Sequence, residues 1–173
     1  MGRPQSLDRT RRQAISERSV MAYHEAGQAV VYHELGYEVG EVSIVPGELP
    51  SYGGYFKPTT PIDDGLIMIL AGNIAQFRQH PMSRLHPALK SLDHFHINRL
   101  IEARAMEADI AEDAINRFVY HFARSHLGPA QSYAECMVDS RWRAIGAVAR
   151  ALMRNTKLDR AGFLDVISDK RRS

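Results

Sequence analysis

The sequence predicts a mainly α-helical protein with a small β element, an α+β fold. Apolar residues recur at three- and four-residue steps over most of the chain, which is typical of amphipathic helices. A single short stretch in the first third alternates apolar and polar residues instead. With 173 residues and no shift of composition along the chain, residues 16–168 are predicted to form one domain. A flexible basic arm (1–15) and a basic tail (169–173) flank it.

The first helix is predicted over residues 16–35, where Gly36 supplies a natural C-terminal stop. The period then changes to two in the segment YEVGEVSIV (37–45), which is rich in β-branched residues and predicts a strand. Pro46 and Gly47 turn the chain after it. The segment YGGYF (52–56) is a candidate for a second strand, with its glycines marking a bulge or a close backbone approach.

The remainder of the chain is predicted to be helical. Pro58 and Pro61 precede the next apolar periodic run, and Ser91 is a suitable N-cap for the one after it. Gly128-Pro129 and Asn155 separate the later segments. The predicted helices cover residues 62–79, 92–108, 110–127, 130–154 and 159–168.

Composition excludes several classes of protein. The formal charge of +2 gives no reason to expect a nucleic-acid partner, and the only apolar run of note, LIMILAG, is too short to span a membrane. The polar first 18 residues contain no apolar core of a signal peptide. Cys136 is the only cysteine, which rules out an intramolecular disulfide and fits a reducing compartment. A cytoplasmic protein without membrane contact is therefore expected.

The segment AYHEAGQAVV, within the first predicted helix, carries the main chemical signal. In the zinc motif H-E-x-x-H, two histidines four residues apart lie on one face of a helix and bind one ion. The intervening Glu acts as general base toward the metal-bound water. Here His24 and Gln28 occupy the two ligand positions and Glu25 occupies the position of the base.

Gln28 changes what this site is expected to do. An amide oxygen is a neutral, hard ligand that suits calcium or magnesium better than zinc. Zinc affinity is therefore expected to fall unless another side chain supplies the missing nitrogen. Taken alone, the five-residue segment is more typical of an amphipathic helix that carries a partly exposed His-Glu pair.

A wider stretch of sequence resembles the peptidase domain of the FtsH-type ATP-dependent zinc metalloproteases. SVMAYHEAGQAVV is similar to their zinc helix, usually A-Y-H-E-A-G-H-A, and VGEVSIVPGELPSYGGYF is similar to the strand and glycine turn that follow it. IMILAGNIAQF resembles their L-A-G-R-A-A-E helix, and SLDHFHINRLIEARAM their helix with an early Asp. AVARALMRNTKLDRAGFLDVI resembles their C-terminal segment. The resemblance covers residues 16–168 in unbroken order.

The resemblance implies a mainly helical peptidase domain with a small β element beside the site. It places His24 on the first zinc ligand, Glu25 on the catalytic base and Asp93 on the third ligand. Gln28 departs from the second ligand, and Ala75-Gln76-Phe77 stands where the family usually has acidic residues. The chain contains no G-x-x-x-x-G-K-[ST] loop, so ATP binding is not expected.

His96 is an alternative source of the missing ligand. It lies three residues after Asp93 and so shares a helix face with it. His24, Asp93 and His96 would supply two nitrogens and one carboxylate, which is an acceptable catalytic zinc set. The alternative is that His96 simply lies in the polar first turn of a helix and binds no metal.

Two functions remain open at this point. In the first, the chain is a metallopeptidase with zinc as cofactor, acting on unfolded or extended peptides that pair with the strand near residues 42–45. In the second, it is a non-catalytic pseudo-peptidase that binds a peptide or a protein partner without metal. A third reading, nucleic-acid binding by the Arg-rich arm and the DKRRS tail, lacks a recognisable binding module.

Overall fold

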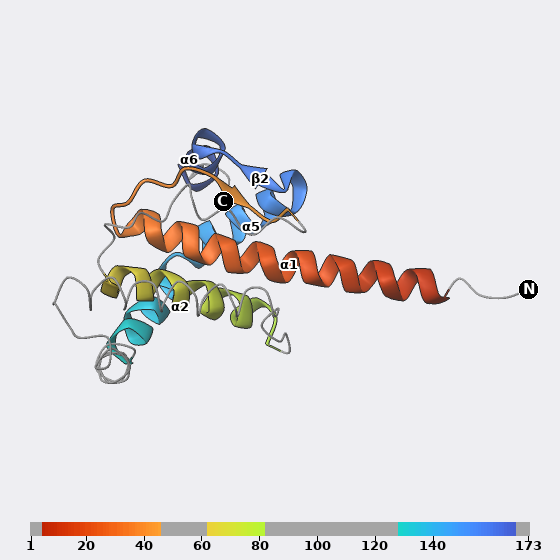
Figure 1. The fold of residues 1–173 in the computed structure, drawn as a ribbon, viewed down its shortest axis with the longest axis horizontal. Coiled ribbons are helices and arrows are strands. Elements are labelled where there is room, and N and C mark those ends of the chain that lie inside the picture. Colours follow the sequence, from red (N-terminus) through yellow and green to blue (C-terminus); the bar gives the residue numbers. More distant parts are fainter. Residues whose placement is uncertain (1–4, 46–61, 82–127, 169–173) are drawn as a thin grey trace, which may run out of the picture.

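The computed structural model describes residues 5–45, 62–81 and 128–168 of the chain (Figure 1). These residues are mostly helical and contain one small antiparallel sheet of two strands, β1 (Val42–Ser43) and β2 (Lys157–Leu158). The predicted fold class, mainly α with a small β element, is therefore confirmed. The predicted strand at 52–56 and the predicted helices at 92–108 and 110–127 lie outside the described residues.

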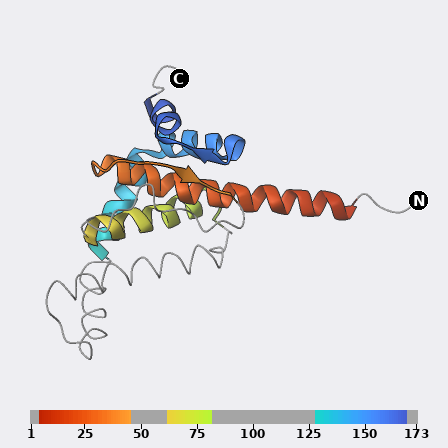
Figure 2. The same cartoon turned by 45° about the horizontal axis from the view of Figure 1, so that its top comes forward.

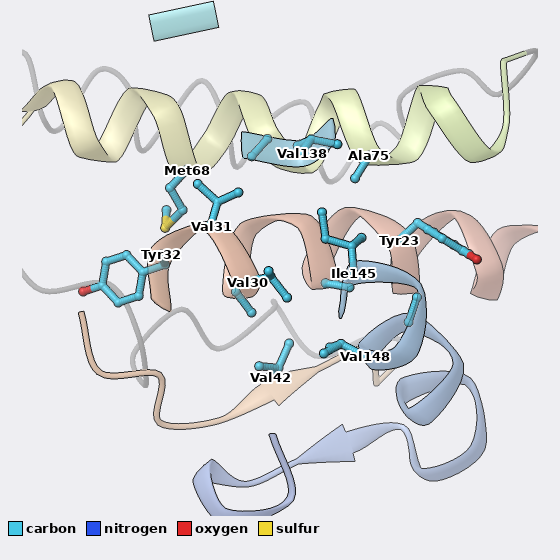
Figure 3. Close-up of a cluster of buried hydrophobic side chains, with 14 of the residues drawn as sticks. Tyr23, Val30, Val31, Tyr32, Val42, Met68, Ala75, Val138, Ile145 and Val148 are labelled. Atoms are coloured by element: carbon cyan, nitrogen blue, oxygen red, sulfur yellow. The ribbon is translucent and has the colours of Figure 1, made fainter. Parts of the chain in front are cut away.

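Helix α1 (Gln5–Glu34) is the central element. Helix α2 (Ile62–Gln79) packs along one side of it, and α5 (Trp142–Asn155) lies with the two strands on the other side (Figure 3). The N-terminal part of α1 projects beyond the other described elements (Figures 1 and 2). The helix begins at Gln5 rather than at residue 16, because residues 5–15 contain neither glycine nor proline to stop it.

The end of α1 agrees with the prediction and has a clear physical cause. Gly36 adopts a φ of 90°, which glycine reaches without the steric penalty of a Cβ. The Gly36 N–H donates to the carbonyl of His33 at 2.9 Å, and the Tyr37 N–H donates to the carbonyl of Tyr32 at 3.2 Å. This pair of bonds is a Schellman motif, which satisfies the last carbonyls of the helix and turns the chain toward β1.

Two glycines allow α1 and α2 to approach closely. A Cβ on Gly27 would lie 2.7 Å from the carbonyl oxygen of Ala71 and 2.7 Å from the Cβ of Ala75. A Cβ on Gly72 would lie 2.7 Å from Cγ of Gln28. No side chain fits at either position, so the two helix backbones meet through small residues. The bounds of α2 agree with the predicted 62–79.

The apolar core includes residues of α2 and continues on the opposite side of α1. Val30 of α1, Val42 of β1 and Val148 of α5 are all buried and converge there (Figure 3). Helix α6 (Arg160–Ser168) closes this side by placing the buried Phe163 ring edge-on to His33, with ring centroids 5.7 Å apart. The C-terminal elements are thereby fixed to the end of α1.

Two local features differ from the prediction. The predicted helix 130–154 is divided into a helix at 128–140 and α5, with Arg141 between them at φ −108° and ψ 13°. No glycine or proline marks this break; the Arg141 guanidinium instead forms an ion pair with Glu34 of α1 at 2.7 Å. Strand β2 was not predicted, since two residues that pair with a distant strand leave no periodic signal.

The close contact of α1 and α2 yields a test of the fold. Gly27→Ala should lower the free energy of unfolding by about 3 kcal/mol, because its Cβ would overlap the backbone of α2. Gly128→Ala is the matched control, since no described residue lies within 4 Å of the added Cβ, and it should leave stability nearly unchanged. Urea denaturation measures both; equal stability of the two variants would contradict the described packing.

Candidate functional site: a buried polar cluster between two helices

The motif residues of α1 are fully enclosed in the protein. His24, Glu25 and Gln28 each have 0% exposed surface, and so does Gln76 of α2. Polar side chains are rarely buried to this degree unless they have hydrogen-bonding partners or a bound ion. These four residues define the polar cluster.

Within the polar cluster, His24 and Gln28 contact each other directly. Nε2 of Gln28 lies 3.0 Å from Nε2 of His24, which is a hydrogen-bond distance. An amide nitrogen only donates, so the imidazole Nε2 accepts and the ring proton resides on Nδ1. The helical spacing of four residues thus brings the two side chains together as the motif predicted, but as a hydrogen-bonded pair.

Helix α2 forms the wall against which this pair lies. The side chain of Gln28 lies over Gly72, where a Cβ would be 3.1 Å from the Gln28 amide nitrogen. One turn later, Gln76 makes a side-chain hydrogen bond with His24. Gly72 provides the space and Gln76 the polar partner, because residues four apart share one helix face.

Burial keeps His24 uncharged. Desolvation lowers the pKa of His24 from its ordinary value of 6.5 to about 4, and the hydrogen bond with Gln76 acts weakly in the opposite direction. At neutral pH the imidazole is therefore neutral, with a lone pair on Nε2. That lone pair could bind a metal ion or accept a hydrogen bond.

The described donors do not fit a catalytic zinc ion. A catalytic zinc site takes three protein ligands, usually nitrogens and carboxylates. Here one imidazole and one carboxamide converge, and the imidazole lone pair already accepts a hydrogen bond from the carboxamide N–H. The described residues contain no group of three His, Cys, Asp or Glu side chains able to hold a metal. The predicted ligands Asp93 and His96 lie outside the described residues.

Gln76 is the member of the polar cluster that the sequence did not assign to the site. In the sequence, Gln76 stands out only because it lies where the FtsH-type family usually has acidic residues. Its signal was its spacing from Gly72, a small residue one turn earlier on the same face. The sequence could not show that this face meets His24, because the two helices are 48 residues apart at the contact between Gly72 and His24.

The sequence matches no protein-family model and no curated protein. Among the helices of the described ranges, none has the length and hydropathy to cross a bilayer.

The lowered pKa of His24 predicts a pH dependence of stability in chelator-treated protein. The unfolded chain takes up a proton at His24 below about pH 6.5 and the folded chain only below about pH 4. The free energy of unfolding should therefore fall as the pH drops through this window, by about 3 kcal/mol from this residue. His24→Gln should remove this contribution, and His33→Gln, on the same helix, should retain it.

NMR titration of the imidazoles gives the same answer without a variant. His24 should stay neutral from pH 7 down to about pH 4. Protonation of His24 near pH 6.5 would show that it is exposed to water, in contradiction to the buried cluster.

Proposed function

We propose that this chain is a non-catalytic relative of the FtsH-type peptidases that acts as a peptide- or protein-binding module. The proposal keeps the family resemblance of the segments around His24 and assigns the polar cluster a structural role. The observation that carries it is the 3.0 Å contact between His24 and Gln28 at full burial. In that contact, Nε2 of His24 accepts a hydrogen bond, and the same nitrogen would have to coordinate zinc.

The burial of Glu25 supports the same proposal. A general base must come within hydrogen-bond reach of the water or substrate proton that it removes. Glu25 and His24 have no exposed surface, so a peptide carbonyl has no direct approach to either in this conformation. The polar cluster instead links α1 to α2 through the hydrogen bond between His24 and Gln76.

A metallopeptidase is the second candidate. It is favoured by the neutral state of His24, since metals bind the uncharged imidazole, and by the Glu25 that follows it. This candidate requires Gln28 to turn away from His24, and Asp93 with His96 to complete a zinc set. Peptide bonds would be its substrate class, and a cytoplasmic location suits either candidate.

Zinc binding separates the two candidates. After dialysis against a chelator and then against zinc, the unmodified protein should hold less than about 0.1 zinc per chain, since two good ligands are too few. Gln28→His restores H-E-x-x-H and should raise this to about one zinc per chain if the resemblance holds. Elemental analysis provides the measurement, and Gln79→His, which adds an imidazole at an exposed position of α2, is the control.

Heat denaturation of the unmodified protein covers the case in which Gln28→His does not fold. The midpoint of unfolding should be the same with zinc and with chelator, because a ligand that does not bind cannot stabilise. One zinc per unmodified chain, lost in Asp93→Ala or His96→Ala, would overturn the proposal and favour the metallopeptidase.

A further inference from the structure

A large groove runs along the flank of α1 that faces away from the polar cluster. Its volume is about 1270 Å³, more than a small-molecule pocket usually has. Residues of α1, the end of α2, the turn at Arg141, α5 and the end of α6 line it. Its apolar part comes from Val30, Ala147, Val166 and Ile167.

The charges of the groove do not balance. Among the described residues, four arginines line it, against two carboxylates. Arg78 forms an ion pair with Asp139, and Arg141 forms one with Glu34 at 2.7 Å. Arg143 and Arg150 have no acidic partner among the described residues, and both are exposed. Two guanidinium groups are thus available to an anionic ligand.

Aromatic stacking fixes the middle of the groove. Trp142 stacks on Tyr23 with ring centroids 5.6 Å apart, and the Arg78 guanidinium lies 4.5 Å from the Trp142 ring centre. Bases of single-stranded nucleic acids bind by stacking on open aromatic faces. Tyr23 and Arg78 already stack against the Trp142 ring, so the groove is poorly suited to binding nucleic-acid bases.

Gly146 positions one of the two available arginines. A Cβ on Gly146 would lie 3.2 Å from a guanidinium nitrogen of Arg150 and 4.0 Å from the hydroxyl oxygen of Tyr23. The Arg150 guanidinium therefore lies over the bare helix backbone at Gly146. A planar guanidinium offers several donors to a carboxylate.

We propose that this groove binds an acidic peptide segment of a partner protein, with its carboxylates at Arg143 and Arg150. The two arginines are seven residues apart on α5, which places them about 10.5 Å apart along the helix axis. Three residues of an extended peptide in the polyproline II conformation span about 9 Å and return to the same side. Two acidic residues three positions apart, with apolar residues between them, match this spacing and the apolar lining.

The inference deepens the proposed binding function, on which it rests, but does not depend on the metal content of the polar cluster. Trp142 is the only tryptophan of the chain and lies in the groove, so its fluorescence reports occupancy. The probe is a capped octapeptide with two Glu residues three positions apart and Leu residues between them. It should change the fluorescence saturably, and binding should weaken as salt is raised.

Variants locate the binding site. The double variant Arg143→Gln, Arg150→Gln should bind the probe at least about tenfold more weakly, since each removes a charge-assisted hydrogen bond. Arg154→Gln is the matched control, because Arg154 is exposed on the same helix but does not line the groove. It should bind like the unmodified chain, and a probe with Lys in place of Glu should not bind.

Three results would overturn the inference. They are no saturable binding of the Glu probe, equal weakening by Arg154→Gln, and tighter binding of a single-stranded oligonucleotide than of the Glu probe. If the Glu probe does not bind and the protein holds no zinc, the groove inference is wrong but the non-catalytic proposal is not contradicted. Saturable binding in a protein that does hold zinc would support the groove and overturn the non-catalytic proposal instead.

Discussion

The close contact between α1 and α2 is the constraint on which the rest of the described structure depends. Gly27 and Gly72 bring the two backbones so near that a methyl group has no room at either position. The polar side chains that the helices carry at this contact are consequently removed from water. Hydrogen bonds within the protein then matter for stability. A buried polar group without one lowers the free energy of unfolding by about 1 to several kcal/mol.

This constraint explains why glutamine suits position 28. A second histidine there would bring two imidazoles together, which a metal ion can bridge but which otherwise compete for one proton. An amide offers donors and an acceptor in one group and pairs with a neutral imidazole directly. Gln76 continues the same chemistry on the facing helix. The polar cluster thus combines two amides and a neutral imidazole with the buried carboxyl group of Glu25.

Helix α1 also contributes residues to the groove, on a flank other than the one that carries the polar cluster. Tyr23 precedes His24 but points to another flank, where it stacks on Trp142. The helix thus separates a dry polar cluster on one flank from a charged, open surface on another. Under the proposed function, the pair of His24 and Gln28 stabilises the fold, and the proposed binding site lies on the α5 side.

Sequence patterns were sufficient where local rules decide. Gly36 predicted the end of α1, and Pro61 with the apolar period predicted α2. The break at Arg141 and strand β2 have no local sequence signal: no glycine or proline lies at the break, and β2 is defined by its pairing with β1. For the candidate site, the sequence identified His24, Glu25 and Gln28 as neighbours. It could not reveal their complete burial or the role of Gln76, which depend on the packing of a distant helix.

Direct detection of the hydrogen bond between Gln28 and His24 tests the central claim most sharply. In protein labelled with ¹⁵N, a scalar coupling across the bond should link the Gln28 amide nitrogen to Nε2 of His24. The Gln28 amide protons should also exchange slowly with water, as expected for a buried pair. Rapid exchange with no coupling, or an Nε2 signal shifted by a bound metal, would contradict the structural role assigned to this pair.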